Sequence, residues 1–194
     1  MTTAKEEQVI LALFKNPEKD LNASSLARVA ALSRMHALRI AKKLEQEQVV
    51  SSRRIGRSRI FTLDLSEEYT RNLVKHLLNR EAKQASPYVR RWISELRRLK
   101  NAKAALLFGS VLRKEKEAND IDVLFITDQK RIEPLEREID ALNRINPKPI
   151  HPIYQSSSDF RRNIRKKDPV VLNALKGIVA FGEEELYEPS SEQD

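Results

Sequence analysis

The chain has 194 residues, of which 40% are hydrophobic and 33% charged, which is enough apolar content to bury a core in one or two folded domains. It contains no Cys, which excludes disulfides, thiolate catalysis and Cys-ligated zinc. No apolar run approaches the roughly 20 residues of a membrane helix, and the N-terminal residues lack the apolar core of a signal peptide, so we expect a cytoplasmic protein without a membrane partner.

The positive charge is concentrated in the first half of the chain. Residues 1–103 contain 22 Lys and Arg against 11 Asp and Glu, a net charge of +11, whereas residues 104–194 contain 14 against 17, a net charge of −3. A localised basic excess is the electrostatic signature of a polyanionic partner, although a basic surface can also serve solubility alone. A nucleic-acid site is therefore expected in the first half.

Residues 3–48 are predicted to form three short helices. Thr3 and Glu6 make a capping box before the first helix, and Asn16-Pro17 ends it. Asn22 or Ser24 caps the second helix. The residues of the second helix expected to face the core are Leu26, Val29 and Ala30. The turn at Leu32-Ser33 then leads into the third helix, which is the spacing of a helix-turn-helix.

The third helix has one apolar arc and one polar side. The apolar arc consists of Ala37, Ile40, Ala41 and Leu44. The opposite side carries candidate DNA contacts, namely Met35, Arg39, Lys42 and, less squarely, Lys43. Arg34 lies at the N-terminal end, where a recognition helix meets base edges.

Residues Val49 to Leu65 are predicted to form a β-hairpin with its turn at Ile55-Gly56-Arg57. Four further candidate DNA contacts crowd its tip, namely Arg53, Arg54, Arg57 and Arg59. Three helices followed by an arginine-tipped hairpin resemble the winged helix-turn-helix family of DNA-binding domains, over about Lys5 to Leu65. The resemblance implies double-stranded DNA as the partner, with the wing on backbone or minor groove. The alternatives are a small helical domain with solvated arginines, a winged helix that binds protein, and RNA binding.

Residues 66–100 are predicted to be a helical connector between two domains. An apolar stripe of the first helix, centred on Leu73 and Leu77, predicts either a homodimer contact or packing onto its own domain. Ser86-Pro87 begins a second helix with an apolar line. That line consists of Tyr88, Trp92, Leu96 and Leu99.

Two apolar runs, Ala104 to Phe108 and Val123 to Ile126, predict buried strands that frame a polar site. Gly109 and Ser110 close the first strand and can open a short helix over Val111 to Glu117, where free backbone N–H groups favour a phosphate. Asp120 and Asp122 are two residues apart on an extended segment, so their side chains leave the same face. Two carboxylates facing a phosphate pocket suit Mg²⁺.

Phe108-Gly109-Ser110, followed after nine residues by Asp120-Ile121-Asp122-Val123, resembles the signature of the DNA polymerase β-like nucleotidyltransferase superfamily, and most of all its minimal branch. The resemblance covers about Asn101 to Gly182. It implies that Gly109, Ser110 and Arg113 hold a nucleoside triphosphate and that Asp120 and Asp122 are catalytic residues that bind Mg²⁺. The alternative is a β-turn with a capping Ser and an exposed acidic pair.

Catalytic members of that superfamily use a third carboxylate on a neighbouring strand, which here is Lys148 to Gln155 and contains no Asp or Glu. His151 is expected to be a strand residue with a local hydrogen bond, and a neutral imidazole is a poor Mg²⁺ ligand. Because the third carboxylate helps to activate the attacking hydroxyl, its loss is expected to depress transfer more than nucleotide binding.

The sequence thus predicts an α/β (α+β) protein. Its parts are a winged helix-turn-helix over residues 1–65, the connector over 66–100, and a nucleotidyltransferase-like mixed sheet with flanking helices over 101–187. The acidic segment from Glu183 is expected to be disordered, with 188–194 as a tail outside the domain. The first function hypothesis is a DNA-binding, transcription-regulatory protein whose second domain binds nucleotide and Mg²⁺ with weakened transfer. The second is an active nucleotidyltransferase acting on a protein, nucleic acid or small acceptor.

Overall fold

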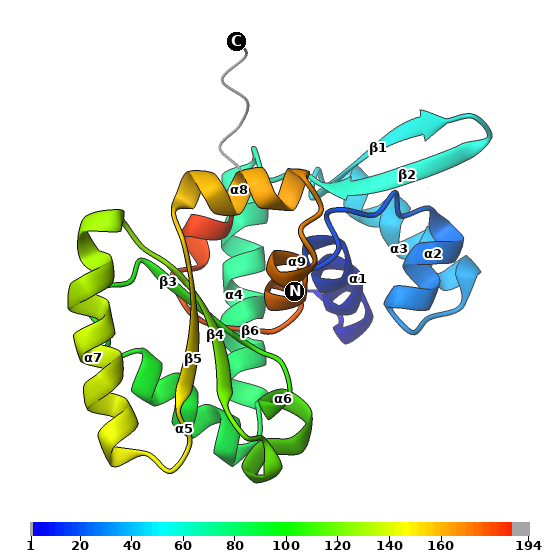
Figure 1. Ribbon diagram of the computed structural model, residues 1–194. Coiled ribbons are helices and arrows are strands. Elements are labelled where there is room, and N and C mark those ends of the chain that lie inside the picture. The colour runs from blue at the N-terminus through cyan, green and yellow to red at the C-terminus, as the bar shows by residue number, and fades with distance from the viewer. Residues whose placement is uncertain (1, 188–194) are drawn as a thin grey trace. The chain divides into compact units, whose positions relative to one another are not determined.

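The computed structural model describes residues 2–187, which divide into two compact units. The first unit comprises the residues up to Leu77 together with Tyr187, and the second comprises Leu78–Leu186 (Figure 1). Between residues 2 and 187, no helix is long and apolar enough to cross a membrane. The tail predicted over 188–194 lies outside the described residues.

The first unit begins with three helices, whose starts are determined by side-chain caps. Helices α1 (Ala4–Phe14), α2 (Ala23–Val29) and α3 (Arg34–Gln46) are capped by Thr3, Asn22 and Ser33. The capping box of Thr3 and Glu6 is confirmed, and Asn22 rather than Ser24 caps α2. The inward placement of Val29 was wrong, because 37% of this residue is exposed.

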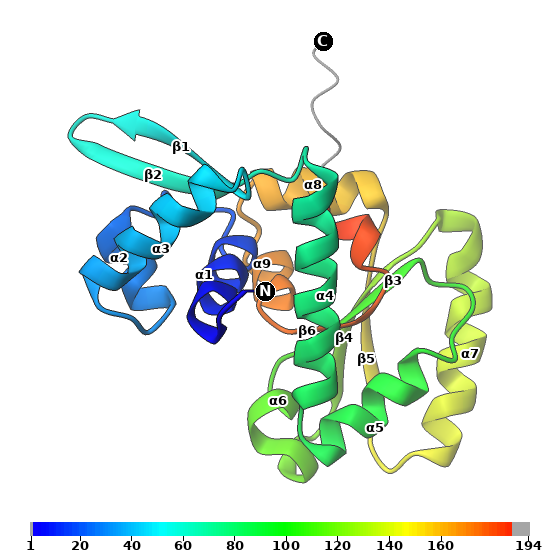
Figure 2. The same ribbon diagram turned by 180° about the vertical axis from the view of Figure 1, so that it is seen from behind.

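A two-stranded antiparallel hairpin follows the helices. Strands β1 (Val50–Ile55) and β2 (Ser58–Leu63) are joined by a two-residue turn, in which Gly56 has a φ of +58°. The backbone N–H of Phe61 donates to the carbonyl of Leu21 over 2.9 Å, which ties the hairpin to the segment before α2. Three helices and a wing in this order confirm the predicted winged helix-turn-helix arrangement (Figures 1 and 2).

Helix α4 (Glu68–Gln84) contains the boundary between the two units, which falls after Leu77. The predicted division at residues 66 and 100 is therefore corrected, since no separate connector is found in the described chain. In the apolar stripe, Val74 and Leu77 are buried and Leu73 is half-buried within this single chain. The homodimer stays a prediction, and these buried residues do not support it.

The second unit is built around a four-stranded mixed sheet of order β5-β4-β3-β6. Strand β3 (Ala104–Phe108) is antiparallel to β4 (Ile121–Ile126) and to β6 (Ile178–Phe181), while β5 (Ile150–Gln155) is parallel to β4. All of β3 is buried, because its strand neighbours and the packed helices leave neither face to solvent. The two predicted apolar strands are confirmed as the centre of the sheet.

Helices α5 (Pro87–Leu96) and α7 (Ile132–Ile145) line one side of this core, whereas α8 (Ser157–Arg165) contacts β5 and α9 (Pro169–Leu175) contacts β3, β4 and β6. The predicted start of α5 at Ser86-Pro87 is confirmed. A 3₁₀ helix over Glu183–Leu186 corrects the expectation of disorder from Glu183, because Leu186 is buried.

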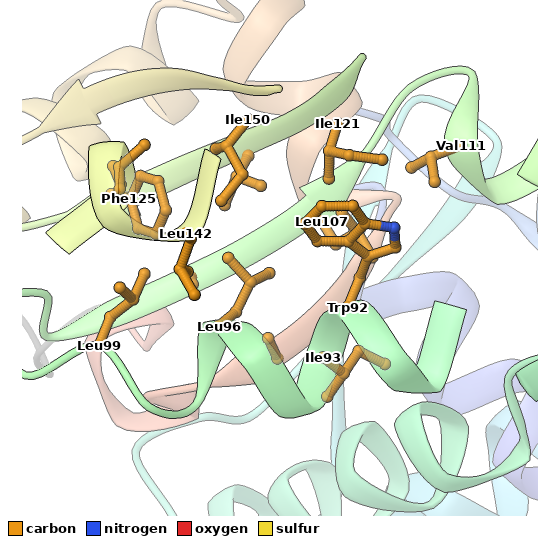
Figure 3. Close-up of a cluster of buried hydrophobic side chains, with 14 of the residues drawn as sticks. Trp92, Ile93, Leu96, Leu99, Leu107, Val111, Ile121, Phe125, Leu142 and Ile150 are labelled. Atoms are coloured by element: carbon orange, nitrogen blue, oxygen red, sulfur yellow. The ribbon is translucent and has the colours of Figure 1, made fainter. Parts of the chain in front are cut away.

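Helix α5, predicted as part of a connector, belongs to the core of the second unit. Figure 3 shows Trp92 and Leu96 directed from α5 toward the sheet, and Ile93, Leu107 and Leu142 belong to the same buried cluster. Arg97, which directly follows α5, donates from its guanidinium Nε to the carbonyl of Ala180 in β6 over 2.7 Å. The connector assignment failed because an apolar stripe shows that a helix is buried but not against which partner.

Truncating the α5 core residue Leu96 to Ala should destabilise the second unit. The side chain is fully buried, so its loss leaves a cavity that should cost about 2–5 kcal/mol of unfolding free energy. The control is Tyr69→Ala on α4, since 61% of Tyr69 is exposed and a surface change should stay within about 0.5 kcal/mol. Denaturant unfolding followed by circular dichroism measures both. Equal effects would contradict the assignment of α5 to the core.

Candidate nucleic-acid interface and metal site

Helix α3 presents a polar face opposite its buried one. The predicted apolar arc of Ala37, Ile40, Ala41 and Leu44 is buried, as expected for helical periodicity. Arg34, Met35, Arg39 and Lys42 are exposed on the rest of the helix, with 74% of Met35 open to solvent. Exposing the apolar thioether of Met35 to water is unfavourable. Together with three cations it makes a suitable contact surface for base edges and methyl groups.

His36 lies on the same face, next to Arg39. The Arg39 guanidinium Nη2 is 3.1 Å from His36 Nε2. The pKa of His36 lies below its ordinary value, mainly because of partial desolvation and further because of the positive charges of Lys5 and Arg39. Because the imidazole carries no negative charge, this contact leaves the positive charge of Arg39 uncompensated.

Lys43 differs from the other cations of α3 because an internal ion pair holds it. Its ammonium Nζ is 2.7 Å from Glu6 Oε1 of α1 and 3.6 Å from Glu47. Glu6 is only 5% exposed, and its other carboxylate oxygen accepts the Thr3 N–H of the capping box. Hydrogen bonding to Glu6 raises the pKa of Lys43. The charge of Lys43 therefore joins α1 to α3, while its side chain remains 50% exposed and its DNA-contact role stays a prediction.

Replacing Lys43 by Met should destabilise the first unit most at neutral pH. The Lys43 hydrogen bond lowers the pKa of Glu6 below its ordinary value of 4.5, so this pair contributes stability above that pH and loses it as the pH falls through the folded-state pKa. In Lys43→Met the buried carboxylate has no cation, and the loss should shrink as acid neutralises it. Thermal unfolding between pH 3 and 7 measures this, with exposed Lys42→Met as the control. A loss independent of pH would contradict the argument.

The four arginines of the wing fall into two pairs. Arg53 Nη2 is 2.9 Å from Asp20 Oδ1, and Arg59 Nη2 is 2.6 Å and 2.7 Å from the two carboxylate oxygens of Glu45. Arg54 and Arg57 are exposed and form no ion pair with any residue between positions 2 and 187. The wing tip therefore carries two uncompensated positive charges, while Arg53 pairs with the segment before α2 and Arg59 pairs with α3.

The predicted acidic pair lies at the start of β4, the strand between β3 and β5. Asp122 in β4 is register partner of Phe108 in β3 and of His151 in β5, and Asp120 directly precedes β4. One ligand atom from each of Asp120, Asp122 and His151 lies within 4.8 Å of the others. These residues, called the acidic cluster below, are the only group of three or more such side chains found among the described residues.

Gly109 makes room for Asp122. Its φ is +80°, and a Cβ atom on it would lie 2.1 Å from Asp122 Oδ2, far inside van der Waals contact. Glycine is therefore required here both by the backbone conformation and by the approach of the carboxylate. The glycine of the predicted Gly-Ser pair thus touches the acidic cluster.

The helix after Gly109 is shorter than predicted. The expected helix over Val111 to Glu117 is divided into α6 (Val111–Lys114) and a 3₁₀ turn over Glu115–Glu117, because Glu115 takes a φ of +48°. Ser110 makes no side-chain cap, and Arg113 is exposed. Four residues carry little helix dipole, so a phosphate here would depend on the backbone N–H groups of the turn and not on a helix.

His151 lies on β5, the strand that was expected to carry a third carboxylate. Its Nδ1 lies 3.1 Å from Asp122 Oδ1, which confirms the predicted local hydrogen bond. His151 is the register partner of Asp122, whereas Ile153, two residues further along the same face of β5, is the partner of Leu124. The pairing of β4 with β5, which joins residues 29 positions apart, could not be read from either strand alone.

Two solved structures are similar to parts of this chain. The protein AF1382 from Archaeoglobus fulgidus is 14% identical with a TM-score of 0.38, and the match covers 44% of this chain and 94% of that one. The zinc-dependent MarR family transcriptional regulator AdcR, in its Zn(II)-bound state, is 20% identical with a TM-score of 0.28, and the match covers 50% of this chain and 73% of that one. No protein-family model and no curated protein sequence matches this chain. The fold assignment therefore rests on the elements of the chain itself.

Proposed function

We propose that the first unit binds double-stranded DNA and that the protein acts as a transcription regulator. The observation that carries this proposal is the pair of exposed, uncompensated arginines at the wing tip, Arg54 and Arg57, in the same unit as the exposed face of α3. Cations without internal partners retain their full charge for phosphates. Arg57 lies in the two-residue turn and Arg54 near the end of β1, so both charges are at the free end of the wing.

The two surfaces have different tasks in this proposal. Arg34, Arg39 and Lys42 meet base edges and phosphates in the major groove, and Met35 offers an apolar contact to a thymine methyl group. Arg54 and Arg57 contact the phosphate backbone or the minor groove beside it. Arg53 and Arg59 position the wing through Asp20 and Glu45, and so contribute to binding mainly by holding the tip in place.

Fluorescence anisotropy of labelled duplexes tests the DNA-binding proposal. The double variant Arg54→Ala with Arg57→Ala should weaken binding to every duplex sequence, whereas Arg39→Ala should chiefly relax preference at particular base pairs. A charge-matched control removes two exposed cations from the second unit, Lys130→Ala with Arg131→Ala, and should leave affinity unchanged. If the wing-tip variant and the wild type bind duplex DNA equally at low salt, the proposal is wrong. Tighter binding to an RNA duplex would replace it with an RNA-binding function.

We further propose that the second unit binds a nucleoside triphosphate with Mg²⁺ and only slowly transfers the nucleoside monophosphate to an acceptor, with pyrophosphate as the leaving group. The support is the convergence of Asp120 and Asp122 beside Gly109, with Ser110 and Arg113 following in the chain. Two carboxylates with no ion-paired Lys or Arg among the described residues favour a cation. Mg²⁺ with ATP should raise the melting temperature, and Asp120→Asn with Asp122→Asn should remove the shift.

An active nucleotidyltransferase is the second candidate, and the close approach of Gly109 to Asp122 favours it. Against it stands His151 in place of a third carboxylate, since an acceptor hydroxyl needs a base and a second metal position. Incubation with labelled NTPs and Mg²⁺, with and without DNA, separates the two candidates. Robust labelling of an acceptor that Asp120→Asn abolishes would establish transfer and overturn the weakened-transfer proposal.

A further inference from the structure

We propose that the acidic cluster is a three-ligand site for a first-row transition-metal ion, with Zn²⁺ and Mn²⁺ bound in preference to Mg²⁺ because His151 supplies the third ligand. This inference rests on the proposed metal binding at Asp120 and Asp122 and changes the identity of the metal. It concerns the ligand set of this chain, in which an imidazole stands beside two carboxylates.

The three side chains converge from two adjacent strands. Asp122 lies near the start of β4 and Asp120 in the bend just before it, while His151 of the parallel strand β5 is the register partner of Asp122. Their ligand atoms lie within 4.8 Å of one another. Around a single ion with bonds of about 2.0–2.2 Å, ligand atoms stand roughly 3–4 Å apart, so small side-chain rotations are sufficient.

The charge of the cluster also favours a cation. In the described part of the chain, no Lys or Arg forms an ion pair with Asp120 or Asp122, and His151 is the one basic side chain in contact with Asp122. The His151 side chain is 66% exposed, so its ring can turn without disturbing the core. The ring nitrogen that now bonds to Asp122 would be available to a bound ion.

The nitrogen ligand determines which metal is preferred. Mg²⁺ takes oxygen ligands and binds imidazole poorly, whereas imidazole suits Zn²⁺ and the neighbouring transition ions. Along the first row a given mixed site binds Zn²⁺ more tightly than Mn²⁺. Three protein ligands leave further coordination positions open, and these would accept the phosphate oxygens of a nucleotide or water.

Isothermal titration with each metal ion alone tests the inference on the full chain without an added affinity tag. The wild type should bind Zn²⁺ most tightly, then Mn²⁺, then Mg²⁺. Because loss of even an outer-shell partner weakens a metal site about 10–100-fold, His151→Gln should lower Zn²⁺ affinity by at least about tenfold and leave Mg²⁺ affinity nearly unchanged. His151→Asp should raise Mg²⁺ affinity and narrow the preference for Zn²⁺. Mn²⁺ bound to the wild type should show imidazole nitrogen coupling in pulsed electron paramagnetic resonance, and His151→Gln should lose it.

The matched control is His76→Gln, which removes another exposed imidazole far away in the sequence and should leave every affinity as in the wild type. Unchanged Zn²⁺ affinity in His151→Gln, or an equal loss in His76→Gln, would overturn the inference. If either result is found while Asp120→Asn still removes the melting-temperature shift produced by Mg²⁺ with ATP, the proposed nucleotide binding stands and only the proposed metal preference is wrong. If neither Zn²⁺ nor Mg²⁺-ATP responds to Asp120→Asn, both fall.

Discussion

Duplex DNA binding should weaken by about 10³–10⁵ between 50 and 200 mM salt if about six to ten phosphates are neutralised. The expectation follows from the net charge of +11 in residues 1–103 and from the exposed cations of α3 and the wing tip. Each neutralised phosphate contributes about 0.9 to the slope of log affinity against log salt, so Arg54→Ala with Arg57→Ala should flatten the slope by about 1.8. Anisotropy titrations at four or five salt concentrations give this slope.

The paired arginines supply the comparison for this experiment. Arg53→Ala with Arg59→Ala removes the same charge but also frees Asp20 and Glu45, so it should reduce binding through loss of wing position. A slope that is identical in the wild type and in the Arg54 and Arg57 variant would show that the wing tip does not reach the phosphates. Unchanged slope in the control Lys130→Ala with Arg131→Ala confirms that the effect belongs to the first unit.

Replacing Gly109 by Ala should abolish metal binding by the second unit and destabilise it strongly. At a φ of +80° an alanine is strained by about 1–2 kcal/mol. The new Cβ would also lie 2.1 Å from Asp122 Oδ2, so the carboxylate must leave its place, with an overpacking cost of about 1–3 kcal/mol. Displaced Asp122 can no longer share an ion with Asp120. Denaturant unfolding and metal titration measure the two consequences.

Gly56→Ala separates the strain from the collision. Gly56 also has a positive φ, of +58°, but a Cβ on it meets nothing within 4 Å. It should therefore cost only the backbone strain of about 1–2 kcal/mol and leave metal binding intact. If both alanine variants bind metal like the wild type, Asp122 has room to adapt and the required close approach at Gly109 is refuted.

Features that depend on neighbours within a few residues could be predicted from the sequence. The Thr3 capping box, the start of α5 at Ser86-Pro87 and a hairpin turn around Gly56 each satisfy a local backbone requirement, so they could be predicted without the fold. The same holds for Asp120 and Asp122, whose spacing of two on an extended segment places both on one face before any pairing is known.

Which distant residues come into contact depends on tertiary packing. The ion pair of Lys43 with Glu6 joins positions 37 apart, and helical periodicity alone did not indicate that this lysine shares its charge with α1. The fixing of Arg59 by Glu45 likewise divides four equivalent-looking arginines into anchors and free cations. The place of His151 beside Asp122 depends on parallel pairing of β4 and β5, and a shift of that register by one residue would turn His151 to the other face of the sheet.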